Sequence, residues 1–169
     1  ITLNGVSKVY YAPGWRIGYM ALHDPVSKLN DIKDGLERLL RSRLCASTPA
    51  QYGYIAGLEG NDDWMKSYSS DLKSRNEHCV ELIENIEGLS VEKPQGAFYM
   101  FIKLTEDHWK DRDKEFVLNL LENKHVLTVH GSGFSSQYGK DHFRIVFLPS
   151  KDILSDAFNR IDEFLKDHR

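Results

Sequence analysis

The sequence predicts an α/β fold, with a small sheet covered by helices. Three observations favour it: two extended runs open the chain, three segments with helical apolar spacing follow, and strand-like runs then alternate with two helices. The chain has 169 residues, of which 41% are hydrophobic, enough for the core of one domain or slightly more.

Residues 1–22 should form two short strands around a turn. Val9–Tyr11 lead into Pro13 and Gly14, and the extended run Trp15–Leu22 follows. We expect a domain boundary near His23, where paired strands give way to helices.

Three helices should come next. Asp24-Pro25 and Thr48-Pro49 each combine a capping residue with a proline, and Asp62 or Asp63 caps a longer third helix that Gly88 ends. Apolar residues recur at helical spacing in the first helix (Val26, Leu29, Ile32, Leu36 and Leu39) and in the third (Met65, Tyr68, Leu72, Cys79, Leu82, Ile83 and Ile86).

The second half should mix strands and helices. One face of Phe98–Leu104 is apolar, and Val126–Val129 and Phe143–Leu148 are rich in the β-branched residues typical of strands. A helix is expected near Lys114–Glu122, and Ser150 should cap the last one. The apolar stripe of that last helix contains Ile153, Leu154, Ala157, Phe158, Ile161, Phe164 and Leu165.

Composition excludes several classes of partner. The net charge of -3 argues against a nucleic-acid-binding module, which usually carries a basic excess. No apolar run approaches the roughly 20 residues of a membrane helix. Cys45 and Cys79 fall in predicted helices, where free buried thiols fit an intracellular composition, although a disulfide stays possible. No spacing of histidines, cysteines or carboxylates predicts a metal site.

Two positions carry chemistry. Lys8, in the pair Ser7-Lys8, precedes Pro13-Gly14 and Arg16-x-Gly18, so the turn should bring two cations to one ligand. A lysine amine attacks a carbonyl only when neutral, which requires desolvation or a nearby cation. Arg144 lies in an apolar strand, where an unpaired guanidinium is costly, so it should bind an anion. The alternatives are a solvated Lys8, a surface Arg16, and a structural ion pair between Arg144 and a local Asp or Glu.

The joint spacing of Ser7-Lys8, Pro13-Gly14 and Arg16-x-Gly18 resembles the signature of fold type I pyridoxal-phosphate-dependent aminotransferases (class I and II). The resemblance covers essentially the whole chain and is closest to the alanine/aspartate aminotransferase branch. It implies that Lys8 is the catalytic residue and holds pyridoxal 5'-phosphate as a Schiff base, that Ser7 and Arg16 also bind this cofactor, and that Arg144 binds the substrate α-carboxylate.

Other segments extend the resemblance. Pro94–Tyr99 resembles the Gly-Ala-Phe stretch beside the substrate, and His130–Phe134 resembles the glycine-containing loop before the arginine strand. Arg43 falls where some members place an arginine for a distal carboxylate in the neighbouring subunit, although a solvated charged face is an alternative. Gly5 is a departure, because many members carry a phosphate-binding serine there.

The resemblance also implies an organisation. Residues 1–22 would be the terminal strands of the large cofactor-binding domain, and residues 23–169 the linking helices and C-terminal small domain. In the family, the acid that keeps the cofactor's ring nitrogen protonated lies upstream of the lysine. We therefore expect this chain to be the C-terminal part of a longer enzyme and inactive alone.

The implied activity is transfer of an amino group between an L-amino acid, alanine or aspartate, and a 2-oxo acid, 2-oxoglutarate. The resemblance further implies a cytoplasmic homodimer that binds neither nucleic acid nor membrane. Two alternatives remain: a pyridoxal-phosphate-dependent β-lyase of the same fold, and a non-catalytic truncated interaction module.

Overall fold

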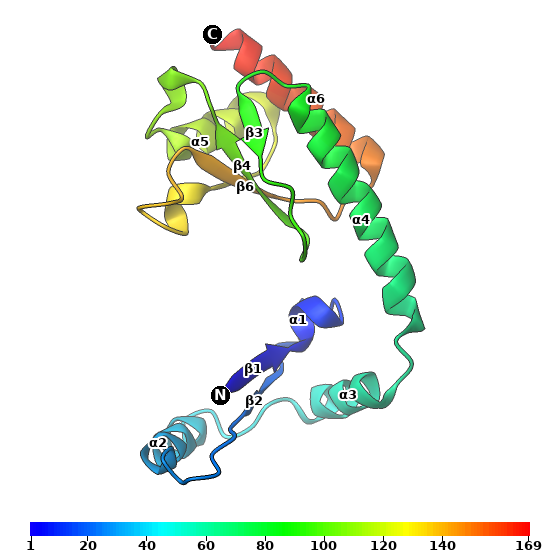
Figure 1. Ribbon diagram of the computed structural model, residues 1–169, viewed down its shortest axis with the longest axis vertical. Helices are drawn as coiled ribbons and strands as arrows, with labels where there is room; N and C mark the ends of the chain where they lie inside the picture. The colour runs from blue at the N-terminus through cyan, green and yellow to red at the C-terminus, as the bar shows by residue number, and fades with distance from the viewer. The chain divides into compact units, whose positions relative to one another are not determined.

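The computed structural model describes residues 1–169, which divide into two compact units, Ile1–Asp63 and Trp64–Arg169 (Figure 1). This division by compactness falls between residues 63 and 64. The domain boundary expected near His23 stays a prediction. No helix combines the length and apolar character needed to cross a membrane.

The first unit opens with a two-stranded ribbon. Strands β1 (Thr2–Gly5) and β2 (Gly18–Ala21) pair antiparallel, with Gly5 opposite Gly18 at the end of the ladder. The strand pair is as expected, but the connection is not a simple turn. It contains a helical turn, α1 (Val6–Val9), and a 3-10 turn, η1 (Pro13–Trp15), so Val9–Tyr11 are not extended.

Helix α2 (Asn30–Arg41) begins later than the Asp24-Pro25 signal predicts. The Asp24 carboxylate accepts hydrogen bonds from the amides of Lys28 (2.8 Å) and Leu29 (3.0 Å) and from Lys33 Nζ (3.0 Å), which closes a turn ahead of the helix. Burial alone would raise the pKa of this carboxyl, but these donors outweigh it and hold the pKa below its usual value.

A small core joins the connection to helix α3 (Thr48–Glu59). It consists of Val6 and Ile17 from the connection and Ala50 and Tyr54 from the helix. The Tyr10 ring meets the Tyr54 ring edge-on, with centroids 5.8 Å apart. Helix α3 is therefore the support on which the connection between β1 and β2 rests.

The second unit holds a four-stranded antiparallel sheet. Its order is β3 (Leu89–Val91), β4 (Tyr99–Leu104), β6 (His142–Val146) and β5 (Val129–His130). Three helices lie beside this sheet in Figure 1: α4 (Asp63–Glu84), α5 (Asp113–Lys124) and α6 (Lys151–Asp167). Short 3-10 turns, η2 (Asp107–Trp109) and η3 (Gly131–Gly133), complete the unit.

One face of this sheet carries most of the core of the unit. Met100, Ile102 and Leu104 are buried, as the alternation in Phe98–Leu104 predicts, and Phe143 lies beside Ile102 on β6. The Phe116 ring of α5 packs on Phe143 (5.1 Å between centroids) and on Phe164 of α6 (5.5 Å). The side chains of alternate residues on β4 and β6 consequently point to the opposite, more open face.

Several sequence expectations were wrong in detail. The strand predicted at Val126–Val129 is a two-residue strand further along, β5, and β3 was not expected. Helix α4 ends at Glu84, and Gly88 (φ +94) instead forms the turn into β3. In helix α6, Ile153 of the predicted stripe is exposed. Cys45 is exposed between α2 and α3 rather than buried in a helix, and both thiols are free.

Candidate active site

Three of the predicted site residues lie on the connection between β1 and β2. Ser7 and Lys8 belong to α1, which follows β1 directly, and Arg16 ends η1 just before β2. Lys8 and Arg16 are exposed, whereas Ser7 is partly buried. The sequence expectation of a desolvated lysine amine is thus not met within these residues.

Backbone hydrogen bonds shape this connection. The amide of Val6 donates to Ile17 O (3.3 Å), and Val6 O accepts from the amides of Tyr10 (3.0 Å) and Ala12 (3.3 Å). Val6 is also 1% exposed, so the residue two before Lys8 is an anchored point of the connection.

Arg16 has a left-handed backbone (φ 52°), which turns the chain from η1 into β2. Its Nη1 donates to Pro13 O (2.7 Å), which folds the side chain back over η1. The remaining guanidinium N–H groups can still donate to an anion, since a guanidinium has five donors.

These side chains fit the groups that pyridoxal phosphate presents. Lys8 supplies an amine for its aldehyde, and Ser7 and Arg16 supply donors for its phosphate. Gly5, which replaces a serine common in the family, contributes no side-chain donor.

Arg144 belongs to the second unit and lies in the middle of β6. Its neighbours across the ladder are Phe101 on β4 and Val129 on β5, and it is partly buried. The guanidinium carbon lies 4.5 Å from the centroid of the Tyr99 ring and 4.2 Å from that of the Phe134 ring. Cation–π attraction to two rings therefore compensates the charge.

The alternative of a structural ion pair is not borne out, because aromatic rings and not a carboxylate of the chain contact Arg144. The rings accept none of its conventional hydrogen bonds, so the N–H groups keep their capacity to bind a planar anion. Tyr99 and Phe101 reach this open face of the sheet from β4. Phe134 reaches it from η3, and its ring meets the Phe101 ring edge-on with centroids 6.2 Å apart.

The sequence identified Arg144 but not the two rings that hold it. Tyr99 and Phe134 occur in the two segments that resemble the family, Pro94–Tyr99 and His130–Phe134. Their shared contact with one guanidinium depends on the β4–β6 register and on the path of η3. An arginine in an apolar strand indicates that aromatic partners are needed, but the sequence does not indicate which aromatic residues they are.

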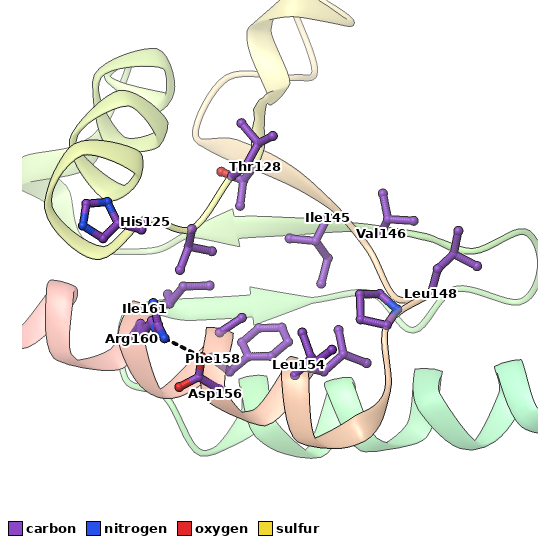
Figure 2. A pocket seen from close by; sticks show the side chains of 15 residues that line it. His125, Thr128, Ile145, Val146, Leu148, Leu154, Asp156, Phe158, Arg160 and Ile161 are labelled. Carbon is purple, nitrogen blue, oxygen red and sulfur yellow. Dashed lines mark ion pairs between the residues drawn. The ribbon is translucent and has the colours of Figure 1, made fainter.

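A cavity of about 530 Å³ lies elsewhere in the second unit (Figure 2). Ile145, Leu154 and Phe158 contribute to a mainly apolar lining, and Arg160 at its edge pairs with Asp156 at 2.8 Å. Arg160, the one Lys or Arg in the lining, is thus already paired, and Arg144 is not among the lining residues.

The segment Pro94–Tyr99, which resembles the family, begins in the turn before β4. This turn is tied to α4, because Asn76 Nδ2 donates to Pro94 O (2.7 Å). Arg43 is exposed just beyond the end of α2. Arg38, on the same helix, pairs with Asp34 at 2.7 Å. No group of three or more His, Cys, Asp or Glu residues is arranged to hold a metal ion.

Comparison with known proteins identifies the class. The family model "Aminotransferase class I and II" matches residues 1–161, so the chain belongs to this family, and its fold is that of the fold type I enzymes. It is 37% identical to the glutamate-pyruvate aminotransferase AlaA of Haemophilus influenzae, over 100% of this chain and 42% of that protein.

Solved structures give the same result. The alanine aminotransferase of Pyrococcus furiosus matches with a TM-score of 0.91 and 51% identity, over 98% of this chain and 42% of that one. The aspartate aminotransferase of Rhizobium meliloti matches with a TM-score of 0.82 and 30% identity, over 96% and 40%. The chain therefore spans about 40% of the length of the relatives it matches.

Proposed function

We propose that this chain is part of a pyridoxal-phosphate-dependent aminotransferase that exchanges amino groups between an L-amino acid and a 2-oxo acid. The observation that carries the proposal is Arg144, whose guanidinium lies between two rings on the open face of the sheet. An α-carboxylate is the one anionic group that amino acids and 2-oxo acids share. A guanidinium binds it through two parallel hydrogen bonds.

We assign the cofactor to residues of the first unit. Lys8 would hold it through its amine, and Arg16, with Ser7, would bind its phosphate. When bound, the cofactor supplies an electron sink that makes the Cα–H bond of the substrate acidic. Lys8 Nζ then takes the Cα proton as a base and returns a proton as an acid. Arg144 holds the carboxylate and so fixes which bond at Cα is presented.

Alanine with 2-oxoglutarate is the substrate pair we favour, and aspartate is the second amino-acid candidate. The names of the relatives from Haemophilus influenzae and Pyrococcus furiosus, a glutamate-pyruvate and an alanine aminotransferase, support the first choice. We further propose that residues 1–22 are the terminal strands of a large domain, and that the complete enzyme is a cytoplasmic homodimer. Arg43 is then a candidate contact to the partner's substrate.

The test is an assay of the complete polypeptide with pyridoxal phosphate, alanine and 2-oxoglutarate. We expect pyruvate and glutamate in equal amounts, and no ammonia. Lys8→Ala should still bind amino acid but lose turnover by roughly 10²–10⁴-fold, because the proton at Cα loses its base. In a second assay without an oxo acid, the amino acid is cysteine, which unlike alanine carries a leaving group at Cβ. Release of sulfide, pyruvate and ammonia from it would favour the β-lyase. Near-normal turnover of Lys8→Ala would refute the role of Lys8.

A further inference from the structure

The position of the Phe134 ring over Arg144 depends on the turn that precedes it. The turn η3 ends at Gly133, and the amide of Phe134 donates back to Gly131 O at 2.8 Å. The His130 ring closes the turn from the other end, since its Nδ1 accepts from the amide of Gly133 (3.1 Å). The backbone of Phe134 is therefore tied to η3, and the position of this turn sets where the ring can lie.

Asp113 ties this turn to helix α5. It is the first residue of the helix and is 3% exposed, the only acidic residue among the buried positions. Its Oδ2 accepts a hydrogen bond from the amide of Ser132 (2.8 Å), in the middle of η3, and lies 3.7 Å from His130 Nδ1. A buried carboxylate is costly without a donor such as the Ser132 amide, and the N-terminus of α5 also favours its negative charge.

We propose that Asp113 is a positioning residue for the substrate carboxylate. It fixes η3, η3 presents Phe134, and Phe134 holds the guanidinium of Arg144 against Tyr99. This inference rests on the function proposed above for Arg144. It adds a residue that touches neither substrate nor cofactor and that acts through the turn.

The physical reason lies in preorganisation. An arginine side chain has several rotatable bonds, and a substrate that must order it loses binding free energy. Two rings at 4.2 and 4.5 Å restrict the guanidinium in advance and displace water from beside it. When η3 shifts, one ring is lost, and the substrate has to order Arg144 itself.

The turn has a second support, which makes the test practicable. Gly131 and Gly139 pack so closely that a Cβ on Gly131 would lie 2.2 Å from Gly139 O. This contact is independent of the Asp113 side chain. Asp113→Ala should therefore fold with a shifted η3, and Asp113→Asn should keep an oxygen that accepts from Ser132.

The experiment compares Asp113→Ala, Asp113→Asn and a control, Asp152→Ala, in the complete holoenzyme. Asp152 is an exposed acid in the first turn of α6, so the control removes a similar charge from a similar helix position. We expect Asp113→Ala to raise the KM for amino acid and oxo acid about tenfold, equivalent to ~1.4 kcal/mol. The value of kcat should stay within about twofold, because Lys8 is untouched. Asp113→Asn and Asp152→Ala should keep KM near the wild-type value.

A second readout does not depend on activity. With selective ¹³C labelling of arginine, the side-chain protons of Arg144 should be shifted upfield by the two rings in the wild type and in Asp113→Asn, and less so in Asp113→Ala. An unchanged KM and unchanged shift in Asp113→Ala would overturn the inference, as would an equal effect of Asp152→Ala. An inactive wild-type enzyme would instead refute the proposed function, and the shift alone would then decide the role of Asp113.

Discussion

At the scale of single residues, Arg144 shows how a charge is kept in an apolar strand. Residues on either side of it, Phe143 and Ile145, point to the covered face, and Arg144 points to the open one. Rings, rather than a carboxylate, compensate the guanidinium. Its N–H groups therefore keep the capacity to donate hydrogen bonds.

Arg144→Lys in the complete enzyme should raise the KM for both substrates by roughly 10²-fold, a cost of a few kcal/mol typical for a lost charge-assisted hydrogen bond. Lysine keeps the charge but cannot form two parallel hydrogen bonds. Steady-state kinetics with both substrates provides the measurement. If both KM values are unchanged, Arg144 has only a structural role.

The two cysteines should differ in reactivity. Cys79 is 0% exposed, and burial raises the pKa of its thiol to about 11, so the reactive thiolate is scarce near neutral pH. Cys45 is exposed. Ellman's reagent at pH 8 should therefore modify one thiol per chain, at Cys45, and two after unfolding in guanidinium. Modification of two thiols in the native chain would contradict the burial of Cys79.

Sequence reasoning is strongest at this scale where a residue type conflicts with its surroundings. Arg144 could be proposed as a site residue because a charge interrupts an apolar strand. Lys8 and Arg16 could be proposed because their spacing resembles a family signature. Asp113 could not be found in this way. An acid at the start of a helix is ordinary, and only the path of a loop nearly twenty positions later brings the Ser132 amide to it.

At the scale of elements, helix α3 supports the connection that carries Lys8 and Arg16. Its contact face has small residues where aromatic rings approach. A Cβ on Gly53 would lie 2.2 Å from the Trp15 ring, and one on Gly57 would lie 3.2 Å from the Tyr10 ring. Trp15 immediately precedes Arg16, so this packing bears on the proposed phosphate site.

Gly53→Ala tests that packing. Alanine should favour a helix by about 1 kcal/mol over glycine, but the clash with Trp15 should cost about 1–3 kcal/mol. We expect lower thermal stability and several-fold weaker cofactor binding in the complete enzyme. Gly35→Ala in α2 is the control, because a Cβ there meets nothing within 4 Å, and it should be neutral or stabilising. Equal behaviour of the two variants would show that Trp15 does not rest on Gly53.

The sequence predicted helices and strands well where apolar residues recur at regular intervals. It predicted them poorly where hydrogen bonds to the backbone set the ends of an element. The helix expected near Lys114–Glu122, the stripe of α6 apart from the exposed Ile153, and the alternation in β4 agree with the structure. The start of α2 was misplaced because the Asp24 carboxylate caps a turn instead of a helix. The strand β5 was misplaced because pairing with β6, which local composition does not encode, sets its extent.

At the scale of the whole molecule, the two units have unequal cores. Only four of the 23 buried hydrophobic residues, Val6, Ile17, Ala50 and Tyr54, belong to the first unit. Its ribbon β1–β2 has no third strand, and a two-stranded ribbon is marginal in water by itself. The second unit has a closed aromatic core and a four-stranded sheet.

The 169-residue chain alone should therefore show strong amide-exchange protection in the second unit and weak protection in the first. Added pyridoxal phosphate should not become attached stoichiometrically to Lys8, because the exposed Lys8 and Arg16, with Ser7, do not enclose a ligand by themselves. Hydrogen exchange, followed by borohydride trapping and peptide mapping, measures both. Stoichiometric labelling confined to Lys8, together with transamination, would show that these residues suffice.

The spacing along α3 also limits how the chain tolerates insertions and deletions. Ala50, Gly53, Tyr54 and Gly57 share one face only because they recur at three- and four-residue intervals. One added residue ahead of Gly53 would rotate everything after it by about 100° and bring a larger side chain under the Trp15 ring. Length variation among homologues should thus spare this helix and accumulate in the exposed segment 60–62 that follows it.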